Sequence, residues 1–527
     1  MFERVEIIRG PASSIYGDSA FFAVVNVVTK KGESIGGTAV AMEVGTLGTR
    51  LLRGSTGQRF DNGAEVAVSA TFENIDGVER LFFPAYGSPD TNHGIAEGLD
   101  GERVGQFYTQ ASLGRFTFTG AYGRRRRTVP TASYGSIFNE QEWREQTVDR
   151  HTLADLEYAR NLGGGARLSI RGSFDRFTYD GHYPFPTEEP GVPLVGHNSV
   201  EGNRWTAAMR LTQPLPGPQV LTVGAEVIDN FDQNQHGEYI DPPLTVLDLE
   251  KSSVQTALYF QDEIKLARWL IVNGGARYDH YQNFQRVTPR AALIAIPSAN
   301  QSFKYLYGRA FRAPNVYERN ELYYGDRVLS LRPESIDTHE LVWERYTNDW
   351  LRTSVSGYWY AANRLITLVA DEASLVGASF VNEGKVRAVG LEFEAQLRPS
   401  GRLQSVVSYA VQRAKDSDTD QMLANSPTHT IKLRVSGPGP IPRSTVAIDA
   451  RYLSARQTLR GTSLGDVAIA DATMVVPLGQ SFEVVGSVRN LFDAAYGDPA
   501  SDAHLDDAIP QNGASARIGL RWTFRRN

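Results

Sequence analysis

The segment Ala514–Phe524, ASARIGLRWTF, alternates between apolar and polar residues almost to the end of the chain. Its apolar face consists of Ala516, Ile518, Leu520, Trp522 and Phe524. Its other face consists of Ser515, Arg517, Gly519, Arg521 and Thr523. A period of two residues is that of a β-strand. The segment therefore predicts a strand with one face in an apolar medium and the other in a polar one.

The same alternation recurs along the chain, for example in Val254–Glu263 and Val389–Leu397. About 22 such segments can be placed after residue 36, an even number within the range of outer-membrane barrels. The predicted fold class is therefore all-β, a transmembrane antiparallel β-barrel of about 22 strands. The competing interpretation is a large soluble β protein such as a propeller. A propeller requires a blade repeat of about 40–50 residues, and we find no such repeat.

The predicted connections alternate in length, which is typical of periplasmic turns and extracellular loops. Tight turns rich in Gly, Pro, Asn and Asp are predicted at Arg59–Asn62, Asn161–Gly164, Pro214–Gly217, Asn348–Asp349, Pro399–Gly401 and Pro477–Gln480. Long polar loops are predicted at Asn74–Asp100, Arg125–Asp149, Asp180–Gly202, Asp232–Lys251, Arg309–Ile336 and Asn490–Gly513. Ligands of barrel proteins meet such loops first, so candidate ligand residues are sought there.

Composition narrows the function classes. The 527 residues include no cysteine, which excludes a disulfide framework and thiolate chemistry. The formal net charge of -6 argues against a nucleic-acid-binding protein. No apolar run approaches the roughly 20 residues of a membrane helix. The first residues also lack the basic and apolar regions of a secretory signal.

The N-terminal stretch carries a specific resemblance. ERVEIIRGPASSIYG at 3–17, followed by VVNVVTKKG at 24–32, resembles the closing segment of the plug domain of TonB-dependent outer-membrane receptors. Val5–Arg9 is predicted to be a buried strand and Phe21–Thr29 a second strand. The residues that match the plug motif are Arg4, Arg9, Gly10, Pro11, Tyr16 and Gly17.

Weaker resemblances to the same family run along the barrel. They are LYFQDEIKL (258–266), VNGGARYD (272–279), FRAPNVYE (311–318), LRPE (331–334), HEL (339–341), VGLEFE (389–394) and RNLFDAAY (489–496). The resemblance implies two domains, the C-terminal remnant of a plug at 1–35 and a barrel at 36–527. The family's signal peptide, TonB-contacting box and most of its plug are not present in this sequence. We therefore interpret the chain as N-terminally truncated within the plug.

The resemblance also implies a function. The family imports scarce solutes through a plugged barrel in the outer membrane, driven by TonB, and a ferric siderophore, another metal chelate or a vitamin is the expected solute. The alternative is a passive, ungated pore or a non-functional gene remnant. Expected partners are outer-membrane lipid and lipopolysaccharide, the TonB complex and a small-molecule ligand, with no nucleic acid. We expect no cofactor and no enzymatic activity, because no catalytic motif is present.

Strand parity places several carboxylates toward the lumen. These are Glu340, Glu344, Glu392 and Glu394. The resemblance suggests that a plug arginine, Arg4 or Arg9, pairs with one of them through charge-assisted hydrogen bonds. The alternative is that these glutamates only line a hydrated lumen. The family's outer-membrane assembly signal falls on Trp522 and Phe524, although three residues follow Phe524.

Candidate ligand residues lie in the predicted outer loops. The aromatic candidates are Phe82, Phe83, Tyr86, Tyr134, Trp143, Tyr183, Tyr323 and Tyr324, which either stack on a ligand or pack the loops. The basic candidates are Arg124, Arg125, Arg126 and Arg127. They would bind lipopolysaccharide phosphates or an anionic ligand, or form a solvated strand end.

Metal motifs are weak in this sequence. Asp416, Asp418 and Asp420 have the opening spacing of a calcium loop, but its sixth and twelfth positions are Gln421 and Pro427, which excludes an EF-hand. We retain them as weak calcium candidates and otherwise expect no metal site. The nine histidines are scattered singly along the chain.

Overall fold

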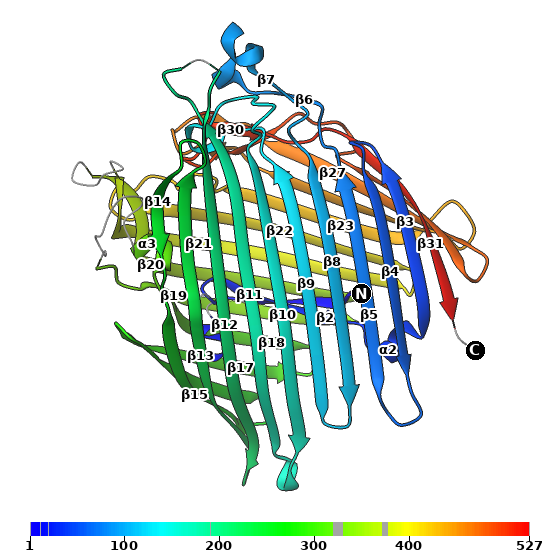
Figure 1. Ribbon diagram of the computed structural model, residues 1–527. Helices are drawn as coiled ribbons and strands as arrows, with labels where there is room; N and C mark the ends of the chain where they lie inside the picture. Colours follow the sequence, from blue (N-terminus) through cyan, green and yellow to red (C-terminus); the bar gives the residue numbers. More distant parts are fainter. Residues whose placement is uncertain are drawn as a thin grey trace.

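The computed structural model describes residues 2–10, 12–18, 20–189, 191–319, 330–371 and 378–525. Antiparallel strands form one closed barrel, and the last strand pairs with the first (Figure 1). The first half of its wall consists of β3 (Gly37–Gly45), β4 (Arg50–Arg59), β5 (Glu65–Ile75), β8 (Glu102–Leu113), β9 (Phe116–Thr128), β10 (Gln146–Asn161), β11 (Arg167–Phe185), β12 (Leu194–Leu215), β13 (Gln219–Tyr239), β15 (Ser253–Ala267) and β16 (Leu270–Tyr281). The second half consists of β17 (Gln285–Ser298), β18 (Gln301–Arg312), β19 (Glu334–Asn348), β20 (Leu351–Ala370), β21 (Ala378–Ser400), β22 (Leu403–Asp416), β23 (His429–Pro438), β24 (Thr445–Leu453), β27 (Val467–Leu478), β28 (Phe482–Arg489) and β31 (Ser515–Arg525).

These 22 strands confirm the predicted barrel. A further strand of the same sheet, β14 (Leu244–Leu249), pairs only with the outer end of β13 and does not complete the wall. Short turns at one end alternate with longer connections at the other, as the sequence predicts. The longer connections contain the small hairpins β6 (Arg80–Phe82) with β7 (Ile95–Glu97), β25 (Arg456–Gln457) with β26 (Ser463–Leu464), and β29 (Gly497–Pro499) with β30 (Ala508–Pro510).

Helices are few and short. The α-helices are α1 (Ser13–Tyr16), α2 (Gly32–Ile35) and α3 (Val316–Arg319). The 3-10 helices are η1 (Pro84–Tyr86), η2 (Pro89–Gly94), η3 (Ser133–Gly135) and η4 (Gly163–Gly165). Among the described residues, no helix has the length and apolar character needed to cross a membrane.

The prediction of a loop at Asp180–Gly202 is wrong for most of that segment. β11 and β12 continue through it and leave only residues 186–193 between them. Beyond the lipid, the outward face of a strand no longer needs apolar residues, so alternation ends while backbone pairing continues. Alternation therefore reveals the part of the strand inside the membrane and misses the part outside it.

The two faces of the wall are distinguished by exposure. In β31, Ile518, Leu520, Trp522 and Phe524 are all 45–59% exposed and lie on the outward, lipid-facing side. Trp522 also stacks on Phe482 of the neighbouring strand. Positions of the opposite parity face the lumen. The same rule places Leu341 outward, at 60% exposure, and its neighbour Glu340 inward.

The N-terminal segment forms a hairpin inside the lumen. β1 (Phe2–Arg9) pairs with β2 (Ala23–Thr29), and both strands lie within the barrel in Figure 1. The expectation that Val5–Arg9 is buried is wrong, because Val5 and Ile7 are 54% and 63% exposed to the lumen. The hairpin contacts the wall through its tip and through Arg9, which lies on the same face of β1 as Val5 and Ile7.

Candidate functional site

The contact between the hairpin and the inner wall is the candidate functional site. Helix α1, at the hairpin tip, touches β16, β17 and β18, and α2 packs on β4 and β5. At the far end of the hairpin, the Thr29 hydroxyl lies 2.8 Å from the hydroxyl of Tyr108 in β8. The hairpin therefore crosses the lumen and is fixed at both sides.

Arg9 provides a charged contact between the two parts. It donates a hydrogen bond to Glu392 of β21 in an ion pair. Glu340 lies close enough to interact electrostatically with both groups. All three line a cavity of about 480 Å³ beside β1. Because the side chains of Arg9 and Glu392 are 61% and 32% exposed, water screens the pair, which stabilises the contact by at most about 1 kcal/mol.

The other two lumenal glutamates bind cations of the barrel itself. Glu344 accepts a hydrogen bond from Lys304 Nζ at 2.6 Å and another from Arg352 Nη2 at 2.7 Å. The same arginine lies 3.5 Å from Glu394. These carboxylates balance charge within the wall and, among the described residues, form no ion pair with the hairpin.

Arg4 forms ion pairs within the hairpin in place of the suggested pair with the barrel. It forms ion pairs with Glu3 and Glu6 of its own strand, at 3.2 and 2.6 Å. Its side chain points along the hairpin because acidic residues flank it in sequence. Of the two arginines suggested by the family resemblance, the structure therefore brings Arg9 to the wall.

The hairpin tip rests on a buried ion cluster. Arg277 donates to Glu226 at 2.7 Å and to Asp279 at 2.8 Å, and its side chain is only 3% exposed. Gly17 packs directly over this guanidinium, so that a Cβ there would lie 2.8 Å from Arg277 Nη2. Its φ of +75° also favours glycine. The plug motif thus has a glycine where the backbone must approach a buried cation.

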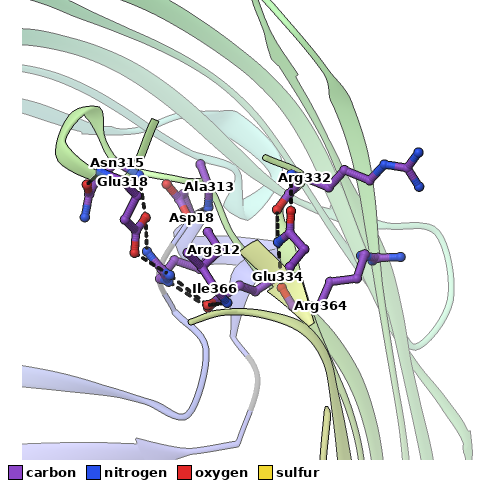
Figure 2. Close-up of polar contacts among 10 residues, drawn as sticks. Asp18, Arg312, Ala313, Asn315, Glu318, Arg332, Glu334, Arg364 and Ile366 are labelled. Atoms are coloured by element: carbon purple, nitrogen blue, oxygen red, sulfur yellow. Dashed lines mark hydrogen bonds and ion pairs between the residues drawn. The ribbon is translucent and has the colours of Figure 1, made fainter. Parts of the chain in front are cut away.

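A second contact joins the tip to the connection between β18 and β19 (Figure 2). Asp18 Oδ1 accepts a hydrogen bond from the Ala313 backbone amide at 2.9 Å. The adjacent Arg312 donates two hydrogen bonds to Glu318 and two to Glu334, at 2.6–2.9 Å. Bidentate pairs of this kind fix orientation as well as charge. The FRAPNVYE and LRPE stretches are therefore one ionic unit, a role that sequence analysis did not assign.

Hydrogen bonds between side chains and backbone groups extend this unit to Ile366 and Arg364 of β20 (Figure 2) and to Asn382 of β21. Glu334 Oε1 also accepts from the Ile366 amide at 2.7 Å. The Asn382 side chain donates to the Arg332 and Arg364 carbonyls, both at 2.8 Å. Arg364 has a φ of +56° at an irregularity in β20, where a bulge redirects its side chain.

Phe21 supplies the apolar part of the hairpin contact. Its side chain is 6% exposed and packs in one cluster with Ala310, Ile336, Ala362 and Val386 of the wall. These residues lie on four neighbouring strands, β18 to β21. The tip is therefore held by one buried aromatic ring in addition to its polar contacts.

Three of the aromatic residues that were predicted as ligand contacts instead contact other side chains of the protein. Phe83 is 1% exposed and contacts Phe138, and Tyr86 stacks on the same ring with centroids 4.2 Å apart. Tyr183 is buried on β11, where its hydroxyl bonds that of Tyr179. These side chains support the outer structure and are not free to stack on a solute.

The remaining aromatic candidates divide into two groups. Phe82, Tyr134 and Trp143 are 57%, 67% and 43% exposed in the outer connections, where a solute can reach them. Tyr323 and Tyr324, like Pro11 of the plug motif, lie outside the described residues.

Glu145 organises the outer connection that carries Tyr134. It accepts hydrogen bonds from the Ser133 amide at 2.9 Å and from the Ser136 hydroxyl at 2.6 Å. Burial raises the pKa of Glu145, although these hydrogen bonds oppose the shift. The connection is therefore ordered around a carboxyl group and is not a loose loop.

The arginine run is split between the two faces of β9. Arg125 and Arg127 face the lumen and pair with Glu102 at 2.7 Å and Asp100 at 3.9 Å. Arg124 and Arg126 share the outward parity of Tyr122, which is 40% exposed. The run therefore does not form a single anion-binding surface.

The outward arginines belong to a larger group. Arg126 pairs in register with Arg103 of β8, and Arg124 with Arg150 of β10. These four residues, which we call the outer arginine patch, lie just beyond outward-facing aromatic residues such as Phe107 and Tyr122. Sequence analysis missed Arg103 and Arg150 because strand register was unknown.

Each of the three calcium candidates forms hydrogen bonds or an ion pair with neighbouring residues. Asp416 accepts hydrogen bonds from the Asp418 and Thr419 amides, and these interactions contribute to a lowered pKa. Asp418 pairs with Lys385 at 3.2 Å, and Asp420 with Lys415 at 2.8 Å. The three do not form one of the close ligand groups found among the described residues.

Residues 85–491 match the family model described as TonB dependent receptor-like, beta-barrel. The chain belongs to the TonB-dependent receptor family. It is accordingly a protein of the outer membrane, and the family consists of transport receptors.

Solved structures have the same fold. The ferripyoverdine receptor of Pseudomonas aeruginosa matches with a TM-score of 0.76 and 14% identity, over 99% of this chain and 76% of that one. The ferric-catecholate import receptor Fiu of Escherichia coli K12 matches with 0.78 and 14%, over 99% and 86%. The ferric enterobactin receptor of P. aeruginosa matches with 0.79 and 16%, over 99% and 85%. At these identities the likeness establishes the fold of the receptor.

Proposed function

We propose that this receptor imports an iron chelate, a ferric siderophore or a similar metal complex, across the outer membrane in a TonB-dependent step. The observation that carries the proposal is a segment inside the lumen that is held on the wall by noncovalent contacts, one of them the screened Arg9–Glu392 pair. Structural relatives named for ferripyoverdine, ferric catecholates and ferric enterobactin support iron as the cargo.

A releasable segment suits gated import. The contact of Arg9 is weak, whereas the tip at Gly17 and Phe21 is buried. A pull on the N-terminal strand would separate the weak contact first and leave the tip in place. We further propose that residues 1–35 act as this plug unit and residues 36–527 as the barrel.

Growth on defined iron sources tests the proposal. A strain that lacks its own ferric-siderophore receptors would express this gene and receive a panel of ferric catecholates and hydroxamates as the only iron. Growth restored by one chelate, and lost when TonB is deleted, would support energised import. Growth that persists without TonB would instead support the ungated pore, and no growth on any chelate would refute the iron proposal.

Direct binding separates recognition from transport. The purified receptor would be titrated with the same chelates while tryptophan fluorescence is recorded. We propose Phe82, Tyr134 and Trp143 as ligand contacts in the outer connections, because their rings are exposed there. Replacing each by Ala should weaken binding, whereas Phe83→Ala would perturb packing instead. Unchanged affinity in all three variants would remove them from the site.

We also propose that the outer arginine patch binds lipopolysaccharide phosphates. Its arginines face away from the lumen, beyond the aromatic residues that mark the edge of the apolar zone. Guanidinium groups bind phosphate with fixed geometry. Arg124→Gln with Arg150→Gln should reduce co-purified lipopolysaccharide, and Arg125→Gln, on the lumenal face, is the matched control. Equal retention in both would refute the proposal.

We also propose that Trp522 and Phe524 of the closing strand β31 form the signal for assembly into the outer membrane, as the family resemblance implies.

A further inference from the structure

On the outer wall of β11, β12 and β13, the outward-facing residues change from aromatic to polar toward the outer ends of the strands. Phe174, Trp205 and Phe231 form an aromatic group on the outward face, with Phe174 and Trp205 directly paired in register. Beyond this group the outward positions are polar, beginning with an ion pair between Arg176 and Glu201. Aromatic residues mark the interfacial edge of the apolar band of membrane barrels. The outer ends of these strands therefore stand in water, outside the membrane.

Strand register brings histidines and carboxylates together at these outer ends. His182 of β11 pairs with His197 of β12, which pairs in turn with Glu238 of β13. Asp180 has the same parity as His182 and so lies on the same outward face. The two imidazole rings stack with centroids 4.8 Å apart. Histidines that stand singly in the sequence thus become neighbours because two long strands pair.

Three of these side chains converge on one point. His197 Nε2 lies 3.1 Å from Asp180 Oδ2, and His182 Nδ1 lies 3.9 Å from Asp180 Oδ1. One ligand atom from each of Asp180, His182 and His197 lies within 4.8 Å of the others. Ligand atoms around a tetrahedral zinc ion are separated by roughly 3.3 Å, as follows from bonds of about 2.0 Å. Small rotations of these side chains would reach that spacing.

A second observation points to a metal ion. While Nε2 of His197 faces Asp180, its Nδ1 lies 3.2 Å from Glu238 Oε1. A carboxylate on the far nitrogen of a ligating imidazole fixes its tautomer and its orientation and increases its basicity. Glu238 is therefore placed as an orienting group for His197. Side-chain exposures of 23–36% leave the three ligand groups accessible from solvent.

We propose that Asp180, His182 and His197 bind a divalent transition-metal ion on the outer wall of the barrel, with Glu238 as a positioning residue. Two imidazoles and one carboxylate suit zinc, copper or nickel more than calcium or magnesium, which prefer oxygen ligands. Three protein ligands leave a further coordination position open to water or to an external anion. The ion would also join β11 to β12 outside the membrane.

The alternative is a set of histidine–carboxylate ion pairs with no affinity for metals. Both arrangements use the same contacts, so binding must be measured. Receptor without a polyhistidine tag, folded in detergent and stripped of metal, would be titrated with Zn²⁺ by calorimetry and with Cu²⁺ by electron paramagnetic resonance. One saturable site per chain with two nitrogen couplings is expected.

Matched variants identify the ligands. His182→Ala and His197→Ala should each weaken binding at least tenfold and leave fewer nitrogen couplings. Glu238→Gln should keep both couplings while weakening affinity about 10–100-fold. His429→Ala is the control, because His429 also lies on the barrel but bonds Tyr409 at 2.9 Å. Circular dichroism would show that each variant is folded, and Asp180→Asn would provide a second ligand test with little change in volume.

The titrations and variants can either support the proposed metal site or overturn it. Loss of the site in the histidine and aspartate variants, with His429→Ala unchanged, supports the proposal. Absence of a saturable site up to about 100 µM Zn²⁺ overturns it, as does affinity unaffected by His182→Ala and His197→Ala. The test does not depend on transport, so its result is independent of the solute that the receptor imports.

Discussion

Arg9 and Glu392 meet in water, whereas Gly17 and Phe21 rest on side chains that are almost entirely buried. Both contacts join the same hairpin to the same wall, yet burial gives them different strengths. An exposed pair contributes at most about 1 kcal/mol, but removing one partner of a buried ion cluster costs about 3–5 kcal/mol. The comparison shows one hairpin that is held firmly at its tip and weakly at Arg9, where β1 meets the tip.

The largest effect is expected at the buried contact of the tip. Arg277→Ala leaves Asp279 and Glu226 as uncompensated carboxylates, one of them almost fully buried. The free energy of unfolding should fall by about 3–5 kcal/mol, measured by urea titration of the receptor in lipid vesicles. Arg277→Lys keeps the charge and should lose less. A loss below about 1 kcal/mol would mean that the cluster does not support the wall.

Phe21→Ala should release the hairpin tip by removing its apolar anchor. Truncating a buried Phe costs about 3 kcal/mol or more, and here the cost falls on attachment of the tip and not on the barrel. Hydrogen exchange of residues 12–18 and 20–22 should accelerate, while exchange in β18 to β21 stays slow. The adjacent Phe22 is 61% exposed, so Phe22→Ala is the matched control. Equal exchange in the two variants would refute the anchor.

A smaller effect is expected at Gly17. A Cβ there meets Arg277, and the backbone, with φ +75° and ψ -150°, lies in a region nearly limited to glycine that costs other residues about 1–3 kcal/mol. Gly10 has a similar φ of +76°, but a Cβ there would meet open space. Gly10→Ala therefore isolates the backbone term, and Gly17→Ala should destabilise the tip further in the same exchange experiment. Identical effects would show that contact with Arg277 is unimportant.

The smallest effect is expected for Arg9→Ala. Overall stability should change by less than about 1 kcal/mol, while a spin label on β1 becomes more mobile. Added salt should mimic the variant in the wild-type receptor, since screening weakens exposed ion pairs. Arg4→Ala is the control because, in the part of the chain that the structure describes, the ion pairs of Arg4 lie within β1. A loss of several kcal/mol would mean that the Arg9 contact is as strong as the buried contact of the tip.

Sequence analysis predicted the parts of this fold that the membrane imposes. Alternation gave the strands because lipid requires an apolar residue at every second position, and the same parity placed Glu392 inside the lumen. Outside the membrane that requirement ends, so alternation does not distinguish the outer halves of β11 and β12 from a loop. The run from Arg124 to Arg127 shows no alternation, so the sequence does not divide it between the two faces of β9.

The candidate site was less accessible to sequence reasoning. Arg312, Glu318 and Glu334 lie within 23 residues of one another in a stretch that was recognised, but nothing local indicates that one arginine binds both acids. His182 and His197 became neighbours only through strand register. Contacts made across strands or across a connection depend on tertiary geometry, which a single sequence does not display.

The unbroken pairing of β11 with β12 has a kinetic consequence. Nineteen consecutive register pairs join the two strands, from Arg167 with Thr212 to Phe185 with Leu194, and the pairs from Arg176 onward lie beyond the aromatic group. A ladder that stands in water with a single free end opens by fraying from that end. Amide exchange along these strands should therefore form a gradient, fastest near Phe185 and Leu194 and slowest at the lipid. A metal ion at His182 and His197 would act as a clamp close to the point where that fraying begins.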